Sequence, residues 1–261
     1  MRAQAGPLYQ VKRADGKMLD IKVTAAGGFA DSAAQDKFCA GSSCVFWTIY
    51  DQSPKGNHLG VAPAGGAHRQ QDKPAPANAG PLTVGGHKVY GLRMDPPSGY
   101  RRDNTTDIAV DDEAETMYAV FNGSHYNNRC CFDYGNAETD NHDDGAGTME
   151  AVYFGSAKGG LNHGGAGKGP WIMADMENAL WGADRVVSNE EPINHDFVTG
   201  RRSAVPLPFF APSEPDEAAA QPWSRATPEP RPATGPSRAP TPRPAPSRPT
   251  GTATARLGTP R

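Results

Sequence analysis

The sequence predicts an all-β protein, a sandwich or barrel over residues 8–200, followed by a disordered tail over 201–261. Two observations lead to this fold class. Short apolar segments recur before Gly200, separated by turns rich in Gly, Asn, Asp and Pro, which is the pattern of many short strands. After Gly200 the composition changes abruptly, because this last stretch holds 15 of the 25 prolines and nine arginines against four acids.

Four apolar segments are expected to form strands: VFWTIY (45–50), ETMYAVF (115–121), MEAVYFG (149–155) and PWIMADM (170–176). One short helix is expected over FADSAAQDKF (29–38), with Asp31 or Ser32 as its N-cap. Short polar side chains at that position accept hydrogen bonds from the first free N–H groups of a helix. No long amphipathic helix can be placed elsewhere in the sequence.

The tail over 201–261 contains no Lys, Asn, Ile, Tyr, Met, His or Cys. A segment of this composition cannot bury a core, and we expect it to be disordered or extended like polyproline. Two interpretations of its origin stay open. The favoured one is a reading-frame error in GC-rich DNA, since the residues present have GC-rich codons and those missing have AT-rich ones. The alternative is a natural Pro-rich linker.

Overall charge and hydropathy exclude some classes of partner. The formal net charge is -3, which does not indicate nucleic acid or an anionic membrane. No apolar run approaches the roughly 20 residues of a membrane span. The N-terminal segment MRAQAGPLYQVKRADGK lacks the apolar core of a signal peptide, so none is expected on this chain.

Two carboxylates, Asp175 and Glu177, stand two positions apart in the apolar run WIMADMENALWG (171–182). Side chains at such a spacing share one face of a strand, together with Trp171 and Met173. Glycoside cleavage uses two carboxyl groups that flank the scissile bond. Glu177 is therefore the candidate nucleophile, and Asp175 is the candidate for orienting the sugar. The alternative is a solvated strand face with alternating acids.

The neighbouring Asn178 could donate a hydrogen bond to a sugar hydroxyl if a bulge turns it inward.

The histidines are scattered without zinc spacing, and the glycine-rich segment GGAGKGP (164–170) does not match a phosphate-binding loop. We therefore expect no metal and no cofactor.

Four cysteines are present, Cys39, Cys44, Cys130 and Cys131, and three pairings are possible. The short loop FCAGSSC (38–44) could close locally and leave the two adjacent cysteines to each other. A bond between adjacent residues closes a strained ring, and strain collects at functional sites. Disulfides would indicate an oxidising compartment, and four reduced thiols are the alternative.

Long motifs of this chain resemble glycoside hydrolase family 54, the α-L-arabinofuranosidases of the B type. The resemblance covers residues 6–200 almost continuously. The matching segments are GPLYQVKRADG (6–16), AAGGFADSAAQDKFCAGSSC (25–44), IYDQSPKGNHL (49–59), VGGHKVYG (84–91), SGYR (98–101), MYAVFNGSHYNNRCCFDYGNAETD (117–140), GTMEAVYFG (147–155) and GPWIMADMENALWGAD (169–184).

The resemblance implies a concanavalin-like two-sheet β-sandwich that hydrolyses terminal α-L-arabinofuranosyl groups with retention. The partner would be an arabinose-containing polysaccharide or oligosaccharide, and the family is secreted. By that similarity Glu177 matches the nucleophile. Substrate-binding positions are matched by Asp175, Asn178, Leu180 and the disulfide pair Cys130–Cys131. Cys39 and Cys44 match a structural disulfide.

Several features depart from the family pattern. The loop SAKGGLNHGGAG (156–167) lacks the family's sugar-contacting tryptophan, and Ala179 stands where some members carry Asn. The family's general acid/base aspartate belongs to a GGDN-like motif beyond the nucleophile, and residues 201–261 contain no such motif. The remaining sandwich strands and the β-trefoil domain are not found either, so the sandwich is expected to be incomplete.

Three hypotheses follow for the function. The first is an exo-acting arabinofuranosidase on arabinan or arabinoxylan side chains, impaired by loss of the acid/base region. The second is a lectin-like sandwich that holds arabinose without cleaving it, and the third is a non-functional gene fragment. A second carboxyl group about 5–5.5 Å from Glu177 would separate the first two, with Asp133 and Glu138 as the acids to check.

Overall fold

The computed structural model describes residues 6–65, 69–109, 113–128, 132–137, 150–157, 168–176, 179–181, 192–204 and 252–257. These residues form fourteen strands and one helix. The elements in chain order are β1 (Pro7–Arg13), β2 (Met18–Lys22), α1 (Ser32–Cys39), β3 (Cys44–Ile49), β4 (Leu59–Val61), β5 (Pro81–Val84), β6 (His87–Tyr90), β7 (Ser98–Arg102), β8 (Glu115–Asn122), β9 (Phe132–Ala137), β10 (Glu150–Gly155), β11 (Trp171–Met176), β12 (Ala179–Trp181), β13 (Phe197–Ala204) and β14 (Thr252–Leu257). All four predicted strands and the predicted helix are confirmed within one to three residues at each end.

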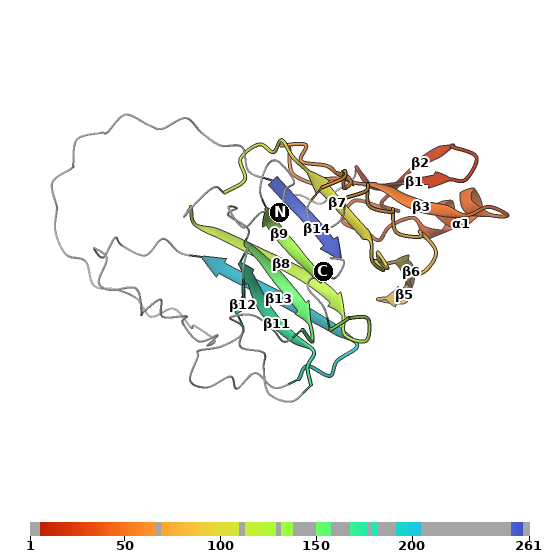
Figure 1. Cartoon of the computed structure of the whole chain (residues 1–261). Helices are drawn as coiled ribbons and strands as arrows, with labels where there is room; N and C mark the ends of the chain where they lie inside the picture. Colours follow the sequence, from red (N-terminus) through yellow and green to blue (C-terminus); the bar gives the residue numbers. More distant parts are fainter. Residues whose placement is uncertain are drawn as a thin grey trace, which may run out of the picture.

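The fold is a β-sandwich, as the sequence predicts. A ten-stranded sheet has the order β12-β11-β10-β9-β14-β7-β4-β3-β1-β2, and its strands pair antiparallel throughout. A two-stranded sheet of β8 and β13 is the second layer, and β5 and β6 form a separate hairpin. Figure 1 shows β1–β6 at one end of the molecule and β8–β13 at the other, with β14 and β7 between them.

The strands from β1 to β7 surround their own apolar core, in which Val11, Ile21 and Phe46 are fully buried. Helix α1 begins after Asp31, whose side chain accepts a hydrogen bond from the Ala34 N–H at 2.9 Å, so Asp31 is the N-cap. The helix also brings Gln35 into the core. There the Gln35 side chain accepts from the Tyr9 hydroxyl and donates to the Ala77 carbonyl, which satisfies both ends of the buried amide.

The second layer packs on the end of the large sheet that carries β9 to β11. Strand β8 alternates buried Met117 and Phe121 with exposed Tyr118 and Val120, the period of a strand covered on one face. The buried side chains meet Val152, Phe154 and Val198 in a second core cluster. Gly200 of β13 allows this close approach, because a side chain there would collide with Val152.

Two parts of the predicted tail are strands. Strand β13 runs to Ala204, past the expected boundary at 200, and residues 252–257 form β14 between β7 and β9. The reason is local composition. Residues 250–259 contain no proline, and TATARL alternates Thr, Thr and Arg with Ala, Ala and Leu, which suits a strand. The rest of the predicted tail lies outside the described residues.

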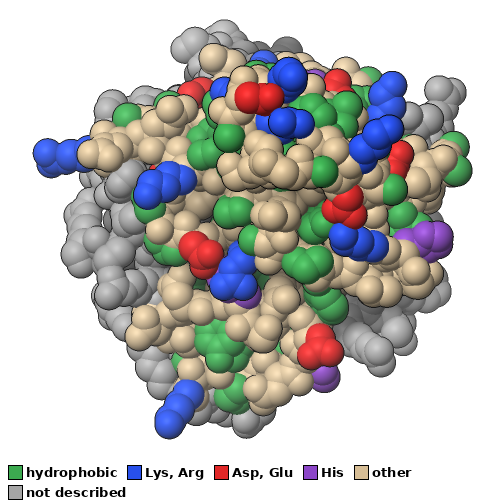
Figure 2. Space-filling view, turned by 90° about the vertical axis from the view of Figure 1, so that its right-hand side faces the viewer, with side chains coloured by type: hydrophobic (Ala, Val, Ile, Leu, Met, Phe, Trp, Pro, Cys, Tyr) green, Lys and Arg blue, Asp and Glu red, His purple; other side chains and the backbone are tan. Residues whose placement is uncertain are grey.

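Charged side chains of both signs occur on the surface. On the face shown in Figure 2, basic and acidic side chains are interspersed and neither sign forms a continuous patch. Within the described part of the chain, no helix is long and apolar enough to cross a membrane.

Candidate functional site

Asp175 lies in the edge region of the large sheet with its side chain buried. It stands on β11, pairs with Ala151 of β10 on one side and Leu180 of β12 on the other, and is only 3% exposed. Ala151 in turn pairs with Gly135 of β9. A side chain at position 135 would collide with the backbone of Glu150 and Ala151, so glycine is required there. The residues paired in succession across β10 and β9 from Asp175, Ala151 and then Gly135, therefore both have very small side chains.

The same face of the sheet carries a layer of large apolar side chains. Trp171 and Met173 alternate with the residues between them and lie on the face of Asp175, as the sequence predicts. They pack with Tyr153 and Ala157 in a compact buried cluster. Asp175 thus follows Trp171 and Met173 on one buried face of β11. Burying a charged group in such apolar surroundings is costly unless it is hydrogen-bonded.

Tyr153 is the polar centre of this layer. Its hydroxyl oxygen accepts a hydrogen bond from the Ala157 N–H at 3.0 Å. Burial raises the pKa of Tyr153 to about 12, the Ala157 N–H acts against the rise, and the charges of Asp175 and Asp133 add to it. The phenol therefore keeps its proton at neutral pH. It places a neutral hydroxyl within electrostatic reach of both carboxylates.

Asp133 is the second buried acid on this face. It pairs with Tyr153 across β9 and β10 and is 4% exposed. Tyr153 pairs with Met173, so Asp133 is level with a residue that precedes Glu177 by four positions in the sequence. Asp133 therefore lies beside Tyr153 of the buried apolar cluster. Its register gives no support to a role as the carboxyl group that flanks the bond opposite Glu177.

The structure locates only part of the predicted sugar site. Asp175 and the backbone of Leu180 are brought together as a pair of neighbours on β11 and β12. Glu177 and Asn178 are the two residues between these strands, and they lie outside the described residues. The predicted pair Cys130–Cys131 and the acid Glu138 also lie outside them.

The other predicted disulfide is confirmed. Cys39 and Cys44 are bonded, with their Cα atoms 5.8 Å apart, and the bond joins the end of α1 to the start of β3. It belongs to the first half of the molecule, where its role is structural. Among the described residues, no group of three or more His, Cys, Asp or Glu side chains could hold a metal ion.

Comparison with known proteins decides the family. The family profile described as "Alpha-L-arabinofuranosidase B, catalytic" matches residues 1–206. The chain belongs to this family. The match ends six residues after the predicted domain boundary at 200. It includes every residue singled out above as a candidate for the sugar site.

Curated family relatives are close in sequence over this region. The chain is 49% identical over 204 residues to a probable alpha-L-arabinofuranosidase B of Aspergillus flavus, and 48% identical over 204 residues to the alpha-L-arabinofuranosidase B of Aspergillus oryzae. Both alignments cover 76% of this chain and 40% of the relative. The chain thus spans about two fifths of the length of the curated relatives it matches.

Solved structures of the family share the fold. One is an arabinofuranosidase complexed with arabinofuranosyl-alpha-1,2-xylobiose, with a TM-score of 0.71 and 46% identity over 77% of this chain and 43% of that chain. A second is a family 54 arabinofuranosidase soaked with a cyclic sulfate inhibitor, with a TM-score of 0.71 and 44% identity at the same coverage. The arabinofuranosidase B fold of the chain is therefore established on both sequence and structure.

The sequence reasoning missed Tyr153 as a polar neighbour of the site and left Asp133 only as an acid to check. Both signals are present in the strand patterns. EAVYFG places Tyr153 two positions after Ala151, and FDYGNA places Asp133 two positions before Gly135, so each shares the face of Asp175. What the sequence lacks is the pairing of β9 with β10 and β11, which sets these residues side by side.

Proposed function

We propose that the chain acts as a retaining, exo-acting α-L-arabinofuranosidase that releases terminal arabinofuranosyl groups from arabinan or arabinoxylan side chains. Family membership supports the reaction, and a related enzyme was crystallised with an arabinofuranosyl xylobiose. The observation that carries the proposal is Asp175, a buried carboxylate beside two minimal side chains, Gly135 and Ala151, at the end of β11.

In this proposal Glu177 is the nucleophile. Its carboxylate attacks the anomeric carbon of the arabinofuranosyl group, the bond to the leaving oxygen breaks, and a covalent arabinosyl-enzyme forms. Water then attacks the same carbon and restores the carboxylate, so the anomeric configuration is retained. Glu177 is the first residue after β11 in the sequence.

The remaining residues would hold the sugar. Asp175 accepts hydrogen bonds from sugar hydroxyls, and Asn178 and the backbone of Leu180 contact the same ring. The pair Cys130–Cys131 would present an apolar sulfur wall to the sugar face. Tyr153 is diagonal to Asp175 across β10 and β11 on the same face, and it would support Asp175 from within the sheet.

The leaving oxygen needs a second carboxyl group. A retaining enzyme uses its second carboxyl group as acid in the first step and as base in the second. Asp133, the buried acid on the Asp175 face, is level with Met173 and not with the end of β11, which does not support it as that second group. General acid–base help is worth about 10²–10⁴-fold in rate. Natural polysaccharides, whose leaving oxygen must be protonated, depend on this help more than substrates with an acidic leaving group do.

Comparing two leaving groups tests the proposal. With dinitrophenyl α-L-arabinofuranoside, whose leaving group needs no proton, we expect a rapid release of about one equivalent of dinitrophenolate and then a slow phase. Turnover of arabinan should be lower by about 10²-fold or more. Glu177→Gln should abolish the rapid release, and Glu113→Gln, at an exposed acid, should leave it unchanged.

The outcomes separate the hypotheses. Binding of arabinose without any release of dinitrophenolate would favour the lectin-like alternative. Neither binding nor release from a folded chain would favour the non-functional fragment. A Glu177→Gln variant that keeps the rapid release would contradict the assignment of the nucleophile.

We also propose that the protein functions outside the cell, in line with its family. The Cys39–Cys44 disulfide supports an oxidising compartment. Fractionating the producing cells tests this, because a protein retained in the cytosol with reduced thiols would contradict it.

A further inference from the structure

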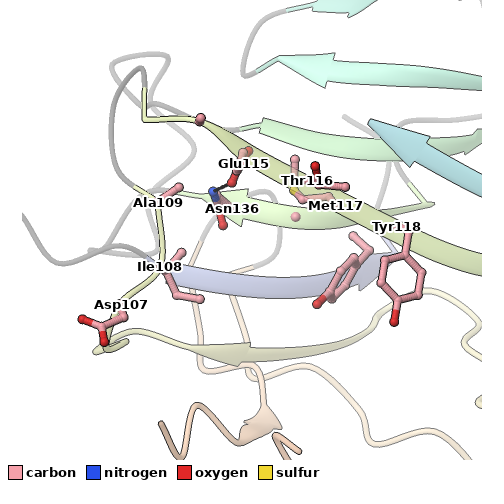
Figure 3. A pocket seen from close by; sticks show the side chains of 11 residues that line it. Asp107, Ile108, Ala109, Glu115, Thr116, Met117, Tyr118 and Asn136 are labelled. Carbon is pink, nitrogen blue, oxygen red and sulfur yellow. Dashed lines mark hydrogen bonds between the residues drawn. The ribbon is translucent and has the colours of Figure 1, made fainter. Parts of the chain in front are cut away.

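A hollow of about 530 Å³ lies on the opposite face of the large sheet from Asp175. It is bounded by the start of β8, the end of β9 and the loop 107–109 (Figure 3). Tyr134 and Asn136 line it, and they alternate along β9 with Asp133 and Gly135. Because side chains alternate between the faces of a strand, the hollow and Asp175 lie on different sides of the same sheet.

The floor of the hollow holds a polar pair. The Asn136 side-chain amide donates to the Glu115 carboxylate at 2.8 Å, and the two side chains come from β9 and β8 (Figure 3). An asparagine amide has two N–H donors and a carbonyl acceptor, and the bond to Glu115 uses one of the two donors. A fixed amide and carboxylate side by side suit vicinal hydroxyls, which both donate and accept.

Two tyrosines stand at the side of the hollow. Tyr118 is 62% exposed and Tyr134 is 36% exposed. Both residues line the hollow, and burial, with smaller effects of Tyr118 and Asp51, raises the pKa of Tyr134. Exposed tyrosine rings combine an apolar face with a polar hydroxyl. They can pack on the C–H face of a sugar ring.

The opposite wall is held in place without a ligand. Asp107 adopts a left-handed conformation, with φ of 53°, and forms an ion pair with Lys55. The Asn57 side chain donates to the Thr106 carbonyl at 2.9 Å and accepts from the Thr106 N–H at 2.8 Å. A wall braced in this way loses little entropy when a ligand binds. The Glu115 carboxylate of the floor disfavours an anionic ligand.

We propose that this hollow is a second saccharide site, which binds a neutral sugar unit of a polysaccharide chain on the face away from Asp175. Its volume is within the range of small-ligand sites, about 300–1,000 Å³. Such a site would hold the polymer on the protein while a side chain of the polymer is at the Asp175 face. The choice of a pentose polymer as ligand rests on the proposed function, but the hollow itself does not.

Native gel electrophoresis with polysaccharide in the gel tests the proposal, using the whole chain with the Glu177→Gln substitution to prevent cleavage. We expect neutral arabinoxylan to retard the protein. Tyr118→Ala should weaken the retardation about 2- to 10-fold, since the packing of one aromatic ring is lost. Ala109→Trp, which fills the hollow, should weaken it as well. Val120→Ala is the matched control, on the same strand and face at 64% exposure but outside the hollow.

Each outcome decides the proposal independently of catalysis. Retardation by arabinoxylan and not by the acidic polymer polygalacturonate, lost in Tyr118→Ala and Ala109→Trp but kept in Val120→Ala, supports it. Equal retardation of all variants, or none with either polymer, overturns it. Release of dinitrophenolate by Tyr118→Ala without the Glu177 change should match that of the unsubstituted chain. Failure of the proposed catalytic function would leave the retardation unaffected.

Discussion

Asp133, Tyr153 and Asp175 place two carboxylates and one phenol in a buried layer of the large sheet. Burying charged groups is costly unless they have partners, so buried carboxylates are candidates for a functional role. Asp175 belongs to the proposed sugar site. Tyr153 and Asp133 are level with Met173, two residues before Asp175, and we propose that they position Asp175 without touching the substrate.

Tyrosines with raised pKa values make the stability of the protein depend on pH in the alkaline range. Burial, as the largest cause, raises the pKa of Tyr9, Tyr50 and Tyr153 to about 12 from the ordinary value of 10. The folded chain keeps these phenols neutral, while the unfolded chain ionises them from pH 10 upward. Their stabilisation is therefore complete below pH 10 and is lost as the pH rises from 10 through about 12.

Urea unfolding at several pH values, together with phenolate absorbance, checks this prediction. We expect the unfolding midpoint to fall steadily above pH 10. In the folded protein, part of the phenolate signal from its eight tyrosines should appear only near pH 12. A single titration of all tyrosines near pH 10 in the folded protein would disprove it.

At the level of elements, β14 has the most consequential position. It pairs with β7 through Ala253–Leu257 and with β9 through Thr252–Leu257. Among the described strands, no strand from β1 to β7 pairs directly with one from β8 to β13, so β14 is the strand that continues the sheet between the two halves. Other links exist, such as the hydrogen bond between His125 and the Met94 carbonyl.

A proline in β14 should uncouple the two halves. Ala255 is paired with Tyr100 on one side and Tyr134 on the other, and proline cannot donate to a sheet ladder. We expect Ala255→Pro to lower the free energy of unfolding by about 3 kcal/mol and to split thermal unfolding into two transitions. Thr259→Pro, beyond the strand, is the control. Unchanged calorimetric unfolding of Ala255→Pro would show that β14 does not join the halves.

At the scale of the whole molecule, the sandwich consists of a long sheet with a second layer at one end. The first half has its own core and the Cys39–Cys44 disulfide, while the second half carries both the Asp175 face and the hollow. This arrangement divides the tasks. In our proposals, both carbohydrate sites belong to the second half.

Much of this arrangement could be predicted from the sequence, because it depends on local pattern. Turn residues between apolar runs locate β3, β8, β10 and β11, and Asp31 sets the start of α1. Pairing over long sequence distances could not be predicted. The neighbours of β14 are about 120 and 150 residues away, and nothing in TATARL specifies them. For the same reason Tyr134 and Tyr118 gave no sign of a shared hollow.

The most direct test of the central claim is to identify the residue that becomes covalently attached to the sugar. After a brief reaction with dinitrophenyl α-L-arabinofuranoside and an acid quench, the chain is digested and its peptides are weighed. We predict that the peptide containing Glu177 is heavier by one arabinosyl residue, and that fragmentation places the sugar on Glu177. Release of dinitrophenolate with no such adduct, or an adduct on Asp175 or Asp133, would contradict the assignment.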